Sequence, residues 1–386
     1  MYTIRQYLLA LLDTRGLTRT LGEIDVCRDA QGRPCFSAGN SAAVFRIRLG
    51  GRIRSLRCYL RPMRHLKEIY GQRLLEKELY LHTSPETGVW VDTVVGDWIE
   101  GSTLHETVAQ AAALRDRECL QILVRLFDRL ALALVTDDRA HGDLKPENII
   151  VGDNGTLCPI DFDASYLPAF AGEISPELGT AAYQHPARTA ADFDERIDDY
   201  PAALISTALH ALAADPTLWD RYGSTDGLLY APQRIAADPA YRETLALFER
   251  RGMAVQYRIA QLLAAPTLRL FGLAELLAEA VREKPAARSG TETETPELFV
   301  ENGRWGYRTA ERVVVAPLYD SGFDFTEGLA AVQLGGTWHY IDTAGRTLLS
   351  CPGCAAVKPF RGGKAQVVHD GERQEIVHPL KTPRYQ

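Results

Sequence analysis

The hydrophobic pattern of the first hundred residues predicts a β-sheet. Apolar and polar positions alternate along residues 42–60, AAVFRIRLGGRIRSLRCYL, on both sides of Gly50 and Gly51. Two strand-like runs joined by a glycine pair indicate a β-hairpin. A second hairpin is expected over about 75–99, around the turn signal SPETG. The segment PMRHLKEIYG between the hairpins predicts one short helix.

The pattern changes to a helical period after residue 104. The run ECLQILVRLFDRLALALV keeps apolar residues at helical spacing over eighteen positions, which predicts a long and mostly buried helix. The helical period returns at 199–214 and at 255–282. The first 280 residues therefore predict a small β-rich lobe followed by a larger helical lobe. Residues 283–297, EKPAARSGTETETPE, are polar without an apolar period and have the composition of a linker.

A short β pattern repeats after the linker. The string GRWGY at 303–307 corresponds to GTWHY at 336–340, and residues 325–332 correspond to 360–367. Short β runs with turn glycines and a period near 33 to 35 residues predict a small all-β repeat unit. These units resemble WG repeats, named for the Trp-Gly pair that the first copy keeps. The second copy has His in place of this Gly and the third is a fragment, so an unrelated β meander is the alternative.

Composition indicates a globular protein of two to three domains, with 386 residues of which 46% are hydrophobic and 24% charged. The net charge of −7 provides no overall basic field, so we expect neither nucleic acid nor membrane as a partner. One short region nevertheless contains seven arginines, namely Arg46, Arg48, Arg52, Arg54, Arg57, Arg61 and Arg64. A solvated strand face explains them most simply, and a partner surface is the alternative.

The N-terminus and the cysteines favour a cytoplasmic location. The segment MYTIRQYLLALLDTRG has an apolar run of only five residues, which predicts an amphipathic helix and no signal peptide. Seven scattered cysteines, an odd number, are expected to be free thiols in a reducing compartment. Cys351 and Cys354 form a CPGC pair. Because no second pair or histidine follows at zinc-site spacing, we expect a turn there rather than a metal site.

Two acidic clusters eighteen residues apart carry the candidate chemistry. HGDLKPENIIV covers residues 141–151 and PIDFDAS covers 159–165. Phosphoryl transfer needs metal-binding carboxylates and amides near the phosphates, a carboxylate that orients the attacking hydroxyl, and positive charge for the transferred group. The two clusters supply such groups as Asp143, Lys145, Asn148 and Asp161.

HGDLKPENIIV resembles the catalytic loop of protein kinases, and the DFD at 161–163 resembles their DFG metal motif. The resemblance implies a bilobal kinase-like fold of the α+β class, followed by the small all-β WG-repeat module. It implies that Asp143 is the catalytic base and that Lys145 neutralises charge on the γ-phosphate. Asn148 and Asp161 would hold Mg²⁺, with ATP as the phosphoryl donor.

Further segments favour protein kinases over small-molecule kinases of the aminoglycoside and choline type, which HGD also resembles. GTAAYQHP at 179–186 resembles the GTxxYxAPE end of the peptide-binding segment, although Ala187 replaces the Glu and removes a usual ion pair. Asp198 resembles the helix aspartate that braces the catalytic loop. Gly142 stands where many kinases have an Arg that pairs with a phosphorylated loop, which implies activity without such a switch.

The match is weaker in the β-rich lobe. Aligned on Val44, SAGNSAAV resembles a glycine-rich phosphate loop GxGxxGxV in which only Gly39 survives. Small residues still permit close backbone approach, so we expect a reduced but usable loop. Ser55 and Arg57 share a strand face where kinases place Ala and Lys. The planar guanidinium of Arg57 would keep the charge but not the geometry of that Lys.

The remaining kinase positions are assigned by the same resemblance. Glu68, on the short helix, is the expected acidic partner of Arg57, and Glu76 fits family spacing better but falls in an apparent strand. DWIEG resembles the hinge that binds adenine, through the backbone at Asp97 and Ile99. Gly96 would then be the gatekeeper and would leave an open pocket behind the adenine. Asp163, in place of the DFG Gly, is expected to hold its segment in one state and to bring another carboxylate near the metal.

The sequence thus predicts an N-terminal helical extension (1–21), a kinase-like domain (22–283, with lobes at 22–101 and 102–283), a linker (284–297) and a WG-repeat β domain (298–386). The expected function is ATP- and Mg²⁺-dependent phosphoryl transfer to Ser or Thr hydroxyls of a protein, with the WG repeats recruiting a partner or substrate. A nucleotide-binding pseudokinase scaffold is the main alternative, because of Arg57 and the reduced glycine loop. A small-molecule kinase is the other.

Overall fold

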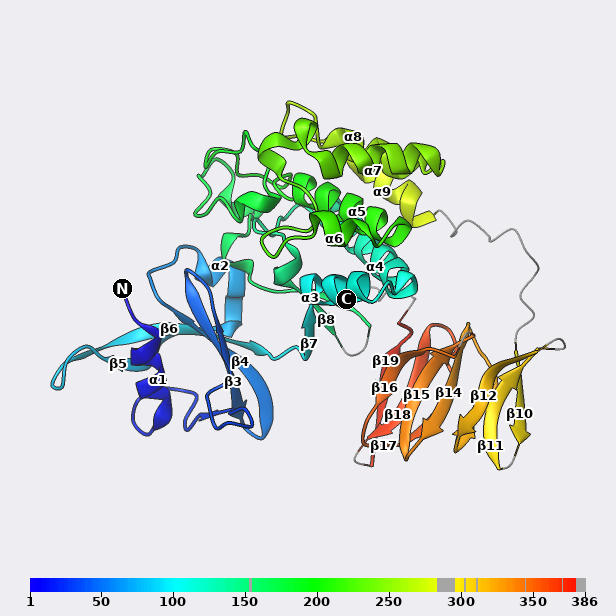
Figure 1. The fold of residues 1–386 in the computed structure, drawn as a ribbon. Helices are drawn as coiled ribbons and strands as arrows, with labels where there is room; N and C mark the ends of the chain where they lie inside the picture. Colours follow the sequence, from blue (N-terminus) through cyan, green and yellow to red (C-terminus); the bar gives the residue numbers. More distant parts are fainter. Residues whose placement is uncertain are drawn as a thin grey trace.

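A computed structural model describes residues 1–152, 155–282, 296–301, 303–309, 312–343, 345–369 and 371–379. The predicted linker falls almost entirely on 283–295, which lie outside the described residues. A sheet lobe, a helical lobe and a β module follow one another along the chain (Figure 1). The α+β class and the two kinase-like lobes are therefore confirmed.

The sheet lobe is built on one antiparallel sheet. Its strands are β1 (Asp25–Val26), β2 (Phe36–Ala38), β3 (Ala42–Leu49), β4 (Arg52–Tyr59), β5 (Leu74–His82) and β6 (Gly88–Asp97). They lie in the order β1-β3-β4-β6-β5, with β2 paired to β3. Both predicted hairpins are confirmed. Gly50 and Gly51 both have positive φ, which is the conformation that a two-residue β3–β4 turn requires.

One face of this sheet forms the core of the lobe. Successive strand residues point to opposite faces, and alternate residues of β3, Phe45 and Ile47 among them, are fully buried. The helix α1 (Ile4–Leu12) adds Tyr7 and Leu11 to the same buried cluster. The predicted N-terminal extension is therefore packed into the sheet lobe, and the opposite face of the sheet carries Val44, Ser55 and Arg57.

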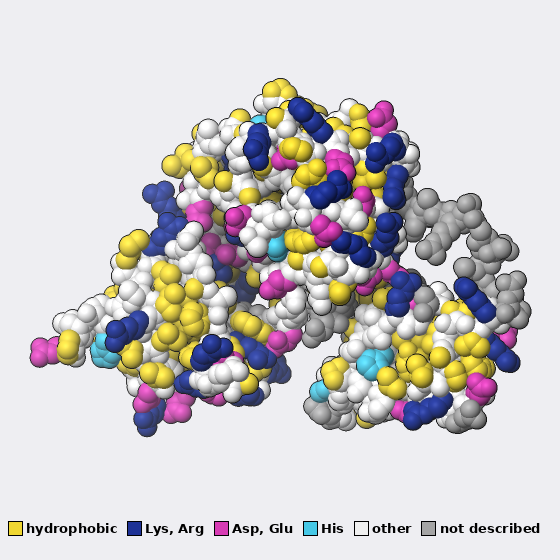
Figure 2. Space-filling model, viewed as in Figure 1, with side chains coloured by type: hydrophobic (Ala, Val, Ile, Leu, Met, Phe, Trp, Pro, Cys, Tyr) yellow, Lys and Arg dark blue, Asp and Glu magenta, His cyan; other side chains and the backbone are white. Residues whose placement is uncertain are grey.

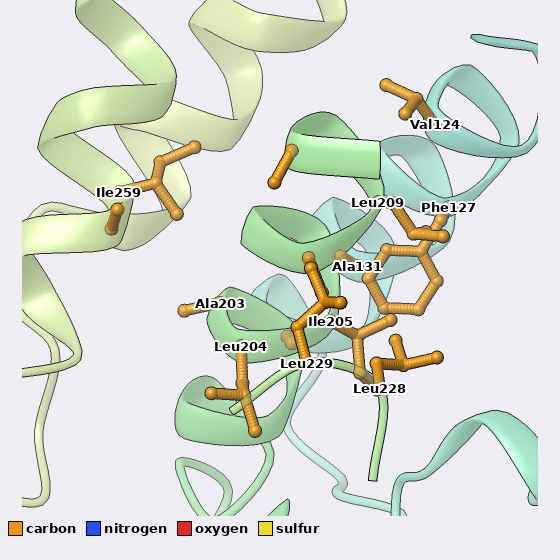
Figure 3. Close-up of a cluster of buried hydrophobic side chains, with 14 of the residues drawn as sticks. Val124, Phe127, Ala131, Ala203, Leu204, Ile205, Leu209, Leu228, Leu229 and Ile259 are labelled. Carbon is orange, nitrogen blue, oxygen red and sulfur yellow. The ribbon is translucent and has the colours of Figure 1, made fainter. Parts of the chain in front are cut away.

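The helical lobe surrounds α4, the long helix that the sequence predicts. Its helices are α3 (Leu104–Ala113), α4 (Arg117–Thr136), α5 (Asp199–Ala214), α6 (Leu218–Tyr222), α7 (Pro239–Arg250), α8 (Ala254–Leu262) and α9 (Leu273–Arg282). Phe127 of α4 and Leu209 of α5 are fully buried and lie in the interface of these helices, beside Leu228 (Figure 3). The packed α4–α5 pair supports the loops that carry the acidic clusters.

The helix predicted over 255–282 is broken. It forms α8 and α9, separated by residues 263–272. Pro266 and Gly272, which has a φ of 83°, lie in that segment. Because proline lacks an N–H and glycine adopts positive φ freely, these residues interrupt the helix although the apolar period continues.

The small elements between the lobes place the two acidic clusters side by side. β7 (Gly101–Thr103), β8 (Ile149–Gly152) and β9 (Leu157–Pro159) form a three-stranded sheet in the order β7-β8-β9. HGDLKPEN precedes β8 and DFD follows β9. Antiparallel pairing of β8 with β9 therefore brings the end of one cluster next to the start of the other, and Ile160 N donates to Asn148 O at 2.9 Å.

The C-terminal module is all β, as predicted. Its strands are β10 (Glu297–Glu301), β11 (Arg304–Arg308), β12 (Val313–Tyr319), β13 (Ser321–Gly322), β14 (Leu329–Leu334), β15 (Thr337–Asp342), β16 (Thr347–Cys351), β17 (Cys354–Val357), β18 (Lys364–His369) and β19 (Glu372–Val377). They form sheets β10–β12, β13–β16 and β17–β19. The CPGC string is the turn between β16 and β17, so the predicted turn is confirmed.

The sequence repeat in this module is also a repeat of contacts. The ring centroids of Tyr307 and Phe325 are 4.8 Å apart, and those of Tyr340 and Phe360 are 4.7 Å apart. Each tyrosine hydroxyl donates to a backbone carbonyl at 2.7 Å. Gly306 is needed in the first copy because an added Cβ would lie 2.7 Å from a β12 carbonyl oxygen. Equivalent aromatic pairs thus stabilise successive units.

The arginine-rich region is largely neutralised by carboxylates. The ion pairs are Arg46–Glu100, Arg48–Asp25, Arg54–Asp97, Arg57–Asp161, Arg57–Asp163 and Arg61–Glu177. Figure 2 shows basic and acidic side chains interspersed over both lobes. Among the described helices, none has the length and apolar character needed to span a bilayer.

Candidate active site

The HGDLKPEN loop, residues 141–148, is held from the helical lobe by Asp198. This residue lies at the N-terminal end of α5, and its carboxylate accepts hydrogen bonds from the backbone N–H groups of His141 and, at 3.0 Å, Gly142. Burial raises the pKa of the Asp198 carboxyl, while His141 and the two N–H donors oppose that rise. The brace that the sequence predicts at Asp198 is present.

Gly142 has a steric reason to be glycine. Its φ is 81°, and an added Cβ would lie 2.0 Å from the carbonyl oxygen of Ala164. An arginine cannot occupy this position without moving the chain after DFD. The predicted independence from a phosphorylated loop stays a prediction, but the replacement itself follows from the close backbone contact.

The structure gathers the predicted catalytic residues around Asp143. Its Oδ1 accepts the backbone N–H of Thr180 at 2.6 Å, and its Oδ2 accepts from Asn148 Nδ2 at 3.2 Å. Lys145 Nζ lies 3.5 Å from Asp143 Oδ2 and donates to Thr180 Oγ1 at 2.9 Å. Gly179, with a φ of 72°, permits this approach, since a Cβ there would lie 2.9 Å from Asp143 Oδ1.

The donor set next to Asp143 fits a magnesium ion. Asn148 Nδ2 donates to the backbone oxygen of Asp143 at 2.9 Å, which leaves the amide oxygen for a metal. The Ile160–Asn148 backbone bond brings the chain just before Asp161 next to Asn148. No group of three or more His, Cys, Asp or Glu side chains suited to a metal occurs in the described part of the chain. Mg²⁺ fits such a site because it commonly takes one or two carboxylates and completes its shell with phosphate oxygens and water.

Arg57 reaches from β4 to the DFD segment. Its Nε and Nη2 lie 3.0 and 2.7 Å from Asp163 Oδ2, and Nη2 also contacts Asp161. Burial alone would lower the pKa of the guanidinium, but these two carboxylates raise it. Asp161 has a φ of 68°, a left-handed conformation that is uncommon for a non-glycine residue. Surrounding side chains raise the pKa of its carboxyl by burial, and Arg57 opposes this.

The predicted pairing of Glu68 with Arg57 is wrong. α2 (Leu66–Tyr70) buries Leu66 and Tyr70, whereas Glu68 lies on its exposed side. A helix of five residues has only one buried side, and that side presents the tyrosine to the site. The carboxylate that meets Arg57 comes instead from Asp163, and Glu76 is exposed in β5.

The predicted nucleotide-binding residues Val44, Ser55 and Gly96 lie together on the face of the sheet that carries Arg57. Val44 on β3 is paired with Arg57 on β4, and Ser55 on β4 is paired with Gly96 on β6. Since residues two apart on a strand share a face, Ser55 and Arg57 point to the same side. An added Cβ at Gly96 would lie 3.1 Å from Ser55 Oγ, so glycine here avoids a tight contact with this serine.

The predicted hinge and glycine loop have fewer contacts that define a nucleotide site. Asp97 ends β6, and its backbone oxygen accepts from Ser55 Oγ at 3.2 Å. Ile99 lies in the three-residue connection between β6 and β7. Gly39 lies in the turn between β2 and β3, where its N–H donates to Ala42 O at 2.9 Å. A Cβ at Gly39 would come no closer than 4.0 Å to a neighbour, so this turn does not require glycine.

Comparison with known proteins finds distant similarity to protein kinases. Serine/threonine-protein kinase PknL of Mycobacterium tuberculosis is 28% identical over 53% of this chain and 53% of its own length. CBL-interacting protein kinase 17 of Oryza sativa subsp. japonica is 27% identical over 42% of this chain and 35% of its own length. The family model "WG containing repeat" matches residues 308–338. The chain is a distant homologue of serine/threonine protein kinases with a C-terminal WG repeat.

The match to these relatives is partial. The kinase homologue spans about half or less of the length of the curated relatives named above. Serine/threonine-protein kinase chk1 of Schizosaccharomyces pombe is similarly matched, with 26% identity over 40% of this chain and 31% of its own length. The similarity to protein kinases is therefore distant and partial, and catalysis by this chain is a proposal.

The sequence analysis missed three residues of this site. Tyr59 and Tyr70 donate to Asp163 Oδ1 at 3.1 and 2.6 Å. Tyr59 is two positions after Arg57 on the same strand, so the strand pattern could have placed it on the same face. No such pattern in the sequence indicates that Tyr70 on α2 reaches the site. Thr180 lies within the GTAAYQHP string, so its kinase-like surroundings were visible although its contact with Asp143 was not.

Proposed function

We propose that this kinase homologue transfers the γ-phosphoryl group of ATP to a serine or threonine hydroxyl of a protein substrate. The arrangement of Asp143 carries the proposal. The Thr180 N–H and the Asn148 amide orient its carboxylate, and Lys145 lies beside it. A fixed carboxylate next to a lysine can accept the hydroxyl proton while the ammonium stabilises charge on the transferred group.

The other residues would bind and orient the nucleotide. Val44, Ser55 and Gly96 offer a largely uncharged surface for the base on the cleft face of the sheet. Arg57 provides the positive charge on the phosphate side. When bound, Mg²⁺ supplies charge neutralisation on the phosphates, with Asn148 and Asp161 as its protein ligands.

The WG module is proposed to recruit the protein substrate or a partner. It exposes large apolar side chains, and the space-filling view shows apolar atoms gathered on it (Figure 2). These side chains are Val300, Val313, Leu318, Phe323 and Leu334. Exposed apolar groups gathered on a small all-β unit are typical of a protein-binding surface.

A transfer assay tests the proposed activity. The purified chain is incubated with γ-labelled ATP and Mg²⁺, alone and with a generic protein substrate, and the labelled residue is identified. Asp143→Asn should reduce transfer by roughly 10²- to 10⁴-fold, the usual contribution of a catalytic base. Asp138→Asn is the matched control, since this aspartate is exposed and lies outside the loop. Transfer that is absent in the wild type, or equal in both variants, would reject the proposal.

A pseudokinase scaffold is the second candidate, and one observation favours it. Arg57 contacts Asp161, so the phosphate-side cation shares a carboxylate with the metal site. In a scaffold this contact would persist and the chain would bind nucleotide without turnover. Nucleotide binding without any transfer above the Asp143→Asn background would support this candidate.

A further inference from the structure

Asp163 is a buried acid with an unusually complete set of donors. Its side chain is 3% exposed. Oδ2 accepts both Nε and Nη2 of Arg57, at 3.0 and 2.7 Å. Oδ1 accepts the hydroxyls of Tyr59 and Tyr70, at 3.1 and 2.6 Å. Every one of these donors belongs to the sheet lobe, whereas Asp163 belongs to the segment that follows β9.

The arginine needs such a partner. Arg57 has a long side chain with many rotamers, and its guanidinium contributes to binding only when it is held in one orientation. A carboxylate that accepts two guanidinium N–H groups fixes both the position and the plane of the group. The helix acid Glu68 is exposed and does not reach Arg57, so this role is left to the DFD segment.

The two carboxylates hold different parts of the guanidinium. Asp161 contacts Nη2, whereas Asp163 accepts from Nε as well as Nη2. If Asp161 turns to a metal ion, the Nε bond to Asp163 is unaffected. Tyr70 ties α2 to the same carboxylate, so the position of the short helix and the orientation of Arg57 depend on one side chain.

We propose that Asp163 is the positioning residue of Arg57, in place of an acid on the helix, and that Arg57 held in this way binds the nucleotide phosphates. The role of Arg57 as a phosphate ligand rests on the proposed function. The consequence is specific to this chain. The arginine and the aspartate act as one unit, so the loss of either residue weakens phosphate binding.

A double-mutant cycle on nucleotide affinity tests this unit. The dissociation constant of ATP is measured by titration calorimetry, in Mg²⁺-free buffer and with Mg²⁺, for the wild type, Asp163→Asn, Arg57→Met and the double variant. Each single substitution should weaken ATP binding by about 10- to 100-fold, the usual effect of losing a supporting partner. The double variant should be no weaker than Arg57→Met. Glu68→Gln is the matched control and should leave the affinity unchanged.

Equal weakening by Asp163→Asn with and without Arg57 would overturn the proposal, because it would assign Asp163 a structural role alone. If Asp163→Asn does not fold, Tyr70→Phe replaces it, since that change removes one hydrogen bond to Asp163 and keeps the charges. Its smaller loss of affinity should also vanish in the Arg57→Met background, and a loss that persists there would again overturn the proposal. If the ATP affinities follow the predicted cycle but no phosphoryl transfer is detected, the proposed function is rejected while the positioning role of Asp163 is retained.

Discussion

The two sides of the cleft are built in different ways. On the helical side, Asp143, Lys145 and Asn148 come from one eight-residue string and contact one another directly. On the sheet side, Arg57 pairs with Asp163, which is 106 positions away in the chain. The contrast shows that the helical side draws its contacts from one contiguous loop, whereas the sheet side depends on a charge pair between segments far apart in the chain. A buried charge left without a partner is costly, so the sheet side depends on both members of this pair.

The brace under the helical side gives the largest expected effect. Asp198→Ala leaves the N–H groups of His141 and Gly142 without their acceptor in a buried site. We expect transfer to fall by at least about 100-fold, and the free energy of unfolding to fall by about 1–3 kcal/mol for each orphaned donor. Steady-state transfer and urea denaturation measure the two effects. Activity within twofold of the wild type would show that the loop does not depend on α5.

A substitution at the neighbouring Asp199 tests whether support of the loop is specific to Asp198. It is buried, its Oδ1 has no hydrogen-bond partner, and burial raises its pKa to about 7. The folded state therefore keeps a proton that the unfolded state releases near pH 4, so stability must fall as pH rises from about 4 to 7. Asp199→Asn should flatten this decline by on the order of 3 kcal/mol.

Urea denaturation at pH 5 and pH 8 measures this difference in the wild type and in Asp199→Asn. The activity of the variant at pH 8 should equal or exceed that of the wild type, unlike Asp198→Ala. An identical pH dependence in the two proteins would show that the Asp199 carboxyl does not titrate in that window.

On the sheet side, a change at the predicted gatekeeper Gly96 should have a smaller effect, limited to the choice between ATP and a bulky analogue. Gly96, at the predicted gatekeeper position, has no side chain to exclude a bulky group, so an ATP analogue with a bulky N6 substituent should be used within about tenfold of ATP itself. Gly96→Met should discriminate against the analogue while ATP is still accepted. Competition between labelled ATP and the analogue measures the ratio. Rejection of the analogue by the wild type would show that Gly96 does not face the adenine.

Removal of the WG module should have the smallest effect on chemistry. Both sides of the cleft lie within residues 1–282, and the module has its own aromatic pairs and buried clusters. Deleting 298–386 should change transfer to a generic substrate by less than about twofold, since the contacts of Asp143 and Arg57 remain. Capture of the native partner should be lost. An equal loss of both activities would place the module within the catalytic fold.

The helical side could be predicted from the sequence because its information is local. The spacing within HGDLKPEN and the eighteen residues from Asp143 to Asp161 indicate groups that a loop and a strand pair must bring together. The hairpins and the aromatic repeat are similarly short-range. The break between α8 and α9 was readable from Pro266 and Gly272, but the apolar period outweighed them in the prediction.

The sheet side could not be predicted because its contacts depend on tertiary packing. Glu68 and Asp163 are both acids at plausible distances from Arg57 along a kinase-like chain. The choice between them depends on which side α2 buries, and that side carries Tyr70. An exposed acid on a five-residue helix has no sequence pattern that separates it from a buried one. The partner of Arg57 therefore became evident only when the two lobes were placed together.

On the proposed function, the sheet side works with Arg57 at the position where kinases place a lysine. The decisive measurement is kcat/KM for ATP in the wild type and in Arg57→Lys. A compact ammonium cannot supply both the Nε and the Nη2 bonds to Asp163, so we predict a loss of about tenfold or more. A gain in kcat/KM on restoring the lysine would contradict the account, because it would show that Arg57 is a handicap in an otherwise ordinary site.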